Sequence, residues 1–216
     1  MAGFPTGRVV QNATFIGFRG NRGLAFQEWD NRFFFNEPHG TIGFVIVPPW
    51  SAADVEIGTH TIPGGFTIML WIVQYQNPPT QHYWTCRYNA SLGIGLSRWE
   101  FAAAASGSEE IAYHDDPAFK PERFEPRGVV ARWTSGAEGE LGLGPNTMDI
   151  FIGTLTAEMS KGVSIQLGSR PTPIADGGRM QWNTLGARLS SIFGTADVLP
   201  TQRIVGWWNE QRTRFI

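Results

Sequence analysis

The C-terminal stretch Val163–Trp208 decides the fold, and it holds four short runs in order: VSIQLG (163–168), MQWN (180–183), RLSSIF (188–193) and LPTQRI (199–204). A Pro-, Gly- and Asp-rich loop separates the first two runs, and a turn at Gly186 separates the next two. Ile204, Trp207 and Trp208 are spaced i, i+3 and i+4, so they share one face of a helix. The order of strand, loop, strand and short helix predicts a closing unit that buries its last side chains against a sheet.

The whole chain has the composition of an all-β domain. Its 216 residues suit one domain, and 13% aromatic residues with 26 Gly and 14 Pro indicate many strands joined by tight turns. Turn signals recur about every 10–12 residues, which is typical of a sandwich or a barrel. Net charge is -2 and only 17% of residues are charged. We therefore expect no nucleic-acid partner, because phosphate binding needs clustered excess cation.

Cysteine content and hydropathy indicate the cellular compartment in which the chain folds. Cys86 is the only cysteine, which excludes an intrachain disulfide and a Cys-rich zinc site, and its apolar surroundings predict burial. Met1–Ala13 lacks the apolar core of a secretory signal, and no run is long enough to span a bilayer. We expect a chain that folds in the cytoplasm and has no membrane partner.

Individual strands can be placed along the chain. The strongest is Thr41–Val47, which is rich in β-branched and aromatic residues and is stopped by two prolines. Further strands are predicted at 13–18, 24–26, 32–35, 66–75, 82–96, 97–104, 128–134 and 148–152. Met1–Arg22 is expected to be an arm or an edge strand, Ser51–Gly65 a long loop with a weak strand, and Ser106–Arg127 a polar surface excursion with a short strand at Ile111–Tyr113. Several strands are apolar on both faces, which indicates cover by loops or by another subunit.

Several of these stretches, taken in order, resemble one family. Thr41-Ile42-Gly43-Phe44-Val45-Ile46-Val47-Pro48 resembles the "T-I-S-F-W-V-K-P" strand of laminin-G-like, concanavalin-A-like jelly rolls. Gly128–Trp133 is similar to that family's "W-H-H-V-A-A-T-W", and Met148–Gly153 to its "I-R-L-Y-V-D-G". Gly23–Phe35 resembles its opening strands and Ile165–Ile204 its ending, although Pro200 and Arg203 stand where the family has a Ser or Thr cap and a Glu.

The resemblance implies an all-β fold, an antiparallel two-sheet sandwich of jelly-roll type with one short C-terminal helix. It covers a single domain, residues 23–216, preceded by the arm or edge strand at 1–22. It implies no activity, because this fold hosts lectins, glycosidases, lyases and structural modules.

The acidic residues do not predict catalysis. A retaining glycosidase needs two carboxylates about 5–5.5 Å apart, and fold-related glucanases carry them in a pattern like E-x-D-x-x-E. Glu28 and Asp30 fit the first two positions, but Phe33 occupies the third. Glu109 and Glu110 are adjacent, so on a strand they face opposite sides. The chain is therefore predicted not to be an enzyme.

A metal site is also not expected. His114 is followed by Asp115 and Asp116, which are weak candidates for Ca²⁺, yet a hard cation needs more oxygen ligands than this run supplies. His39, His60 and His82 have no partner motif. We expect no cofactor, with Ca²⁺ as the one possibility considered.

Aromatic side chains beside loops are the candidates for ligand or partner contact, since Trp and Tyr supply rigid contact area. Six of them lie in or next to predicted loops: Trp29, Trp50, Tyr75, Tyr83, Trp84 and Trp182. The alternative is that they plug the sandwich ends or a subunit interface. Trp71, Trp99 and Trp133 lie within apolar strands and are predicted to be core.

Two function classes remain open. The first is a non-enzymatic structural or assembly protein, most plausibly a viral or phage virion component of the decoration, tail or fibre type, located in the virion after folding in the host cytoplasm. Its partners would be copies of itself or other virion proteins, because low charge and many aromatics indicate exposed apolar patches. The alternative is a carbohydrate-binding lectin module that recognises a cell-surface glycan.

Overall fold

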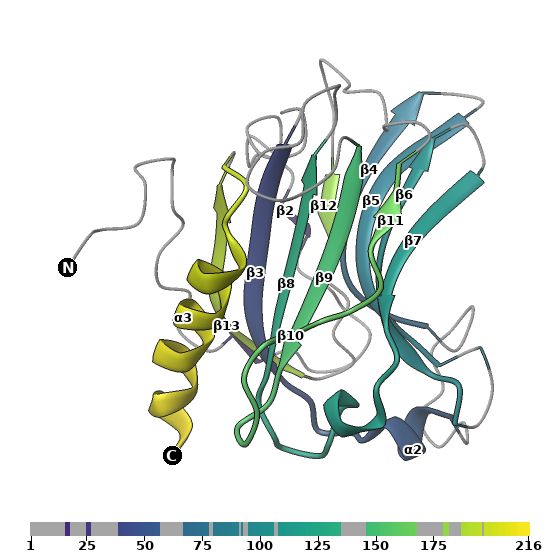
Figure 1. The fold of residues 1–216 in the computed structure, drawn as a ribbon. Coiled ribbons are helices and arrows are strands. Elements are labelled where there is room, and N and C mark those ends of the chain that lie inside the picture. The colour runs from purple at the N-terminus through teal and green to yellow at the C-terminus, as the bar shows by residue number, and fades with distance from the viewer. Residues whose placement is uncertain are drawn as a thin grey trace.

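The protein is an antiparallel two-sheet sandwich with one helix against the outer face of one sheet (Figure 1). This architecture is that of a computed structural model, which describes residues 16–17, 25–26, 39–56, 67–77, 80–90, 92, 95–105, 108–134, 146–167, 179–181, 187–195 and 197–216. It confirms the predicted antiparallel sandwich with a short C-terminal helix. The predicted strand at 32–35 lies outside the described residues.

The first sheet, sheet A, has the strand order β1-β13-β3-β8-β9-β10, and β11 also pairs with β9. Its strands are β1 (Ile16–Gly17), β3 (His39–Val47), β8 (Arg127–Thr134), β9 (Thr147–Gly153), β10 (Ser160–Lys161), β11 (Ile165–Gln166) and β13 (Arg188–Thr195). The strands predicted at 128–134 and 148–152 are β8 and β9, which pair antiparallel with Val130 opposite Phe151.

The second sheet, sheet B, has the order β2-β12-β4-β5-β6-β7. Its strands are β2 (Ala25–Phe26), β4 (Thr67–Asn77), β5 (Thr80–Asn89), β6 (Arg98–Ala105), β7 (Ser108–His114) and β12 (Arg179–Gln181). The closing stretch supplies β12 to sheet B, and β11 and β13 to sheet A. It therefore ties the two sheets together, which is why it decides the fold.

The main core lies between the sheets and is built from alternate residues of each strand. Along β5, Trp84, Cys86 and Tyr88 are all fully buried and face inward. Trp84 stacks on Phe101 of β6 at a ring-centroid distance of 5.5 Å and lies 5.3 Å from Trp133 of sheet A. The predictions that Cys86, Trp99 and Trp133 are core residues are confirmed, while the side chain of Trp71 lies outside the described residues.

A second core lies between sheet A and helix α3 (Thr201–Arg212), which begins after Pro200. Ile204, Trp207 and Trp208 are buried there, as their spacing predicted. The sheet contributes apolar side chains from four strands: Val45, Val130, Phe151 and Phe193. The strands that are apolar on both faces are therefore covered by the chain's own helix in sheet A. A short helix η2 (Thr213–Phe215) follows.

One open side of the sandwich is closed by the segment between β10 and β11. Val163 and Tyr113 exchange both backbone hydrogen bonds, Val163 N to Tyr113 O at 2.7 Å and Tyr113 N to Val163 O at 3.2 Å. Gly162 N donates to Ile150 O of β9 at 2.9 Å. The segment that links two strands of sheet A is thereby joined to β7, the edge strand of sheet B.

Three predictions of local structure were wrong, either in the kind of element or in its length. The segment that begins at Ser51, predicted as a loop with a weak strand, opens with helix α2 (Ala52–Glu56). The polar segment Ser106–Arg127 contains a seven-residue strand, β7, paired along its length with β6, and then a short helix η1 (Pro117–Phe119). The strand predicted to reach Leu96 ends at Asn89.

Candidate functional site

The six aromatic candidates do not form a site in the described part of the chain. Trp50 and Trp84 are fully buried, so neither ring is accessible to a ligand, contrary to the prediction. The physical reason is that each ring fills the core: Trp50 lies 6.1 Å from Tyr88, and Trp84 stacks between the sheets. The side chains of the other four candidates lie outside the described part of the chain: Trp29, Tyr75, Tyr83 and Trp182.

The acidic candidates have local structural roles where they are described. Asp115 and Asp116 are exposed, and the Asp116 carboxylate caps η1 by accepting a hydrogen bond from Ala118 N at 2.9 Å. Within the described ranges, no group of three or more His, Cys, Asp or Glu is placed to hold a metal ion. Glu28 and Asp30 lie outside those ranges.

A cluster of charged side chains lies instead on the outer face of β5, β6 and β7. Because Trp84, Cys86 and Tyr88 point into the core, the alternating residues Arg87 and Asn89 point outward. The strand register places Arg87 beside Glu100 and Tyr113 in one row across the sheet, and Asn89 beside Arg98 in the next. These five residues and Glu109 form the outer-face network.

Arg87 connects the two acids of this network. Its Nε donates to Glu100 Oε2 at 2.7 Å, and its Nη1 and Nη2 donate to the two carboxylate oxygens of Glu109, each at 2.7 Å. Since Arg87 is on β5 and Glu109 is on β7, the bidentate pair spans β6 between them. Between Glu100 and Ala104 on this face, β6 carries the small side chain of Ala102.

Glu100 is the buried centre of the network. Its side chain has no exposed surface, and a buried charge is costly unless it is paired and hydrogen-bonded. Oε2 accepts from Arg87, and Oε1 accepts from Arg98 Nε at 2.8 Å and from Asn89 Nδ2 at 3.1 Å. Three donors from two strands therefore offset the cost of burying this carboxylate.

Arg98 is the least compensated member. Its guanidinium carbon lies 4.1 Å from the centroid of the Tyr113 ring, and its Nε is held by Glu100. Across the described residues, its terminal nitrogens Nη1 and Nη2 donate no hydrogen bond, and 24% of the side chain is exposed. Glu100 and Tyr113 thus fix the plane of the guanidinium, and Nη1 and Nη2, which form one edge of that group, keep no partner among the described residues.

An apolar surface adjoins this edge. Tyr113 is half-buried, and Val163 opposite it is 48% exposed. Residues directly opposite each other in an antiparallel pair direct their side chains to the same face, so the two side chains lie side by side. The site therefore combines a preoriented donor edge with an aromatic and an aliphatic side chain.

The two carboxylates of the outer-face network are both paired. Glu100 and Glu109 each accept hydrogen bonds from Arg87. Sequence reasoning missed the network because charged residues between apolar ones read as a solvated strand face. The available signal was a polar residue at every second position of two neighbouring strands: Arg87 and Asn89 on one, Arg98 and Glu100 on the other.

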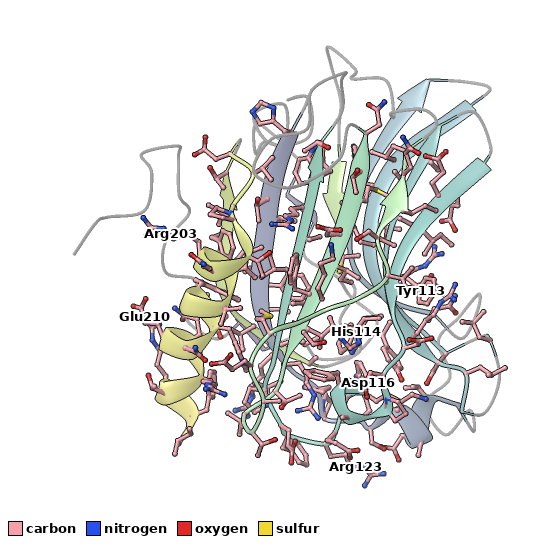
Figure 2. All side chains as sticks on the ribbon, viewed as in Figure 1. Tyr113, His114, Asp116, Arg123, Arg203 and Glu210 are labelled. Atoms are coloured by element: carbon pink, nitrogen blue, oxygen red, sulfur yellow. The ribbon has the colours of Figure 1, made fainter. Side chains whose placement is uncertain are left out.

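His114, next to Tyr113, faces the opposite way into the sandwich (Figure 2). It is 4% exposed, its ring packs 4.9 Å from that of Phe119 in η1, and its Nδ1 has no hydrogen-bond partner in the part of the chain that the structure describes. Burial lowers the pKa of His114 below its ordinary value of 6.5, although Asp116 and Asp115 oppose the shift. This residue belongs to the core and not to the outer-face network.

Among the helices described, none is long and apolar enough to cross a membrane. Neither a protein-family model nor a curated protein matches the sequence. Similarity is found among solved structures, at low sequence identity.

The receptor-binding domain of botulinum neurotoxin type G aligns with a TM-score of 0.50 at 11% identity, covering 81% of this chain and 38% of that one. Domains LG4-5 of the mouse laminin α1 chain align at 0.48 and 10%, covering 89% and 47%. Lectin I-B4 of Griffonia simplicifolia aligns at 0.41 and 9%, covering 87% and 89%. This chain thus spans less than half of the first two. Together with the two-sheet architecture, the likeness to the toxin domain shows the predicted jelly-roll fold, and it shows the fold alone.

Proposed function

We propose that this chain is a non-catalytic carbohydrate-binding module whose ligand contacts the outer face of β5–β7 at Arg98. The observation that carries the proposal is the Arg98 guanidinium, which Glu100 and Tyr113 hold in place while its terminal nitrogens have no partner within the described residues. A donor group that is already ordered loses little conformational freedom when it binds, so its hydrogen bonds contribute more to affinity.

The surroundings of Arg98 suit a sugar. Carbohydrate ligands present hydroxyl groups on their edges and C–H groups on their faces. The network supplies fixed donors for the edge, and Tyr113 with Val163 supplies an apolar surface for the face. The fold is compatible with this use, although it hosts other functions too.

The absence of catalysis is part of the proposal. Glycoside hydrolysis requires one carboxyl group to deliver a proton and another to act as a base or nucleophile. On this face, Arg87 holds Glu109 through both of its oxygens and Glu100 through one. We expect oligosaccharides to be recovered intact after long incubation, and release of reducing ends that disappears in Glu100→Gln would contradict this part.

Binding is tested by calorimetric titration of a panel of oligosaccharides into the purified chain. Arg98→Ala should weaken binding of any saccharide that the native chain binds. Arg203→Ala is the matched control, because Arg203 is an exposed arginine on α3 that points away from the sheet (Figure 2). Unchanged affinity in Arg98→Ala, or an equal loss in both variants, would remove the case for this face.

A structural role in an assembly is the second candidate. The observation that favours it is Phe124, whose large apolar side chain is 72% exposed. Its backbone has φ of 62°, a conformation that is unfavourable for a bulky residue. Leu96, 64% exposed, is a further apolar side chain on the surface. Virion membership and self-association stay predictions from the sequence. Sedimentation should show oligomers that Phe124→Ser weakens, and a strict monomer that binds no particle would contradict them.

A further inference from the structure

We infer that the ligand of the outer-face network carries an anionic group with two oxygens in one plane, the carboxylate or sulfate of an acidic sugar, and that Nη1 and Nη2 of Arg98 hold it. This inference rests on the proposed carbohydrate-binding function and names the chemical class of its ligand.

The distribution of charge within the network is the first argument. Arg87 has the whole carboxylate of Glu109 and one oxygen of Glu100 as its counter-charges. Arg98 has only the other oxygen of Glu100, Oε1, which it shares with Asn89 Nδ2. Arg87 is thus well compensated, and Arg98 is the cation of the network whose positive charge is left partly uncompensated, so that it can pair with an anionic ligand.

The geometry of Arg98 is the second argument. A guanidinium presents its donors as a rigid planar fork that matches a carboxylate or a tetrahedral oxyanion with two parallel hydrogen bonds. Here the Nε edge is occupied by Glu100 and one side of the plane by Tyr113, at 4.1 Å. The edge that remains is the Nη1/Nη2 edge, whose two parallel N–H groups can also hold such a group in bidentate fashion.

The neighbouring side chains indicate that the anion belongs to a larger molecule. A free inorganic anion would gain nothing from the half-buried Tyr113 ring or the exposed Val163 side chain that lies beside it. A sugar ring attached to the anionic group can pack against these two side chains while its carboxylate or sulfate pairs with Arg98.

The experiment compares three oligosaccharides of equal length, one neutral, one carboxylated and one sulfated. Each is titrated calorimetrically into the native chain, Arg98→Ala, Arg98→Lys and the control Arg203→Ala, at low and high salt. Circular dichroism confirms that the variants are folded. We expect an anionic saccharide to bind the native chain about tenfold to a hundredfold more tightly than the neutral one, the range of one charge-assisted contact.

The variants separate this inference from the proposed function. Arg98→Ala and Arg98→Lys should both remove the preference for the anion, because lysine keeps the charge but lacks the planar fork. The ratio of the affinities for the carboxylated and the sulfated oligosaccharide then identifies which anionic group Arg98 binds. Equal binding of neutral and anionic saccharides by the native chain, reduced alike in Arg98→Ala, would overturn the inference and leave the proposed function standing. Failure of every saccharide to bind would overturn both, and an anion preference retained in Arg98→Ala would overturn the inference.

Discussion

Trp208 lies directly over Gly153, so closely that a β-carbon at position 153 would come within 2.5 Å of the indole Nε1. Gly128, paired with Gly153 across β8 and β9, faces the same ring. The indole N–H donates to two backbone carbonyls of the loop that follows β9, Thr154 O at 3.0 Å and Ala157 O at 3.3 Å. Two glycines side by side thus form the recess that attaches α3 to sheet A.

Gly153→Ala should therefore destabilise the protein by about 1–3 kcal/mol, the usual cost of overpacking a filled core. Gly206→Ala is the control in the helix itself, because Gly206 is exposed and, apart from its chain neighbours and the helix's own backbone, no atom of the described residues lies within 4 Å of a β-carbon there. It should stabilise by about 0.5–1 kcal/mol. Urea unfolding measures both free energies, and equal effects of the same sign would contradict the recess.

The buried pair Arg132–Asp149 on sheet A offers a second test. Arg132 donates to Asp149 Oδ2 through Nε and Nη2, at 2.9 and 2.8 Å, and to Leu199 O through Nη1 at 2.8 Å. Asp149→Leu should cost about 3–5 kcal/mol, because it leaves a buried guanidinium without its counter-charge. The double variant Arg132→Met/Asp149→Leu should recover much of that loss. Additive losses in a double-mutant cycle would show that the pair is not coupled.

His114 should make stability depend on pH. Its folded-state pKa lies below the ordinary 6.5, so the unfolded state binds more protons in the window beneath 6.5. The contribution of His114 to the free energy of unfolding is then fully present above pH 6.5, and it is lost as the pH falls through the folded-state pKa. Urea midpoints between pH 5 and 7.5 should fall less steeply in His114→Gln than in the native chain. Identical slopes would assign the pH dependence to other groups.

Cys86 should be inert while the chain is folded. It has no exposed surface, and burial raises the pKa of its thiol far above the ordinary range, so almost no reactive thiolate forms. A thiol reagent at pH 8 should label one group per chain in denaturant and none on the same timescale in buffer. Rapid labelling of the native chain would place Cys86 outside the core.

The sequence predicted the elements whose hydrophobic pattern is long or regular. The strands at 41–47, 66–75 and 128–134 are dense in β-branched and aromatic residues, and the helix carrying Trp207 and Trp208 has a clear apolar face. Helix α2 was missed because five residues give too short a pattern. Its one signal was Ser51 three residues before Asp54, whose side chains cap each other's backbone N–H groups.

The candidate site was harder to predict, because it depends on pairing between strands. Arg87, Glu100 and Glu109 are far apart in the sequence, and only the register of β5, β6 and β7 brings them together. Trp50 and Trp84 were wrongly predicted to be exposed, because that prediction used only their position in the sequence. Position beside a loop indicates exposure only on average: Trp84 lies on the inward face of β5, and Trp50, at the bend after β3, packs against Tyr88 in the core.

The central claim, that Arg98 is the ligand contact, is tested most directly by nuclear magnetic resonance of the arginine side chains. The ¹⁵N-labelled chain is titrated with the best-binding saccharide, and the guanidinium signals are assigned with Arg98→Lys and Arg203→Lys. The account predicts that the Arg98 signals shift saturably, in step with the calorimetric affinity, while the Arg203 signals stay in place. Saturable binding that leaves the Arg98 signals unmoved would contradict it.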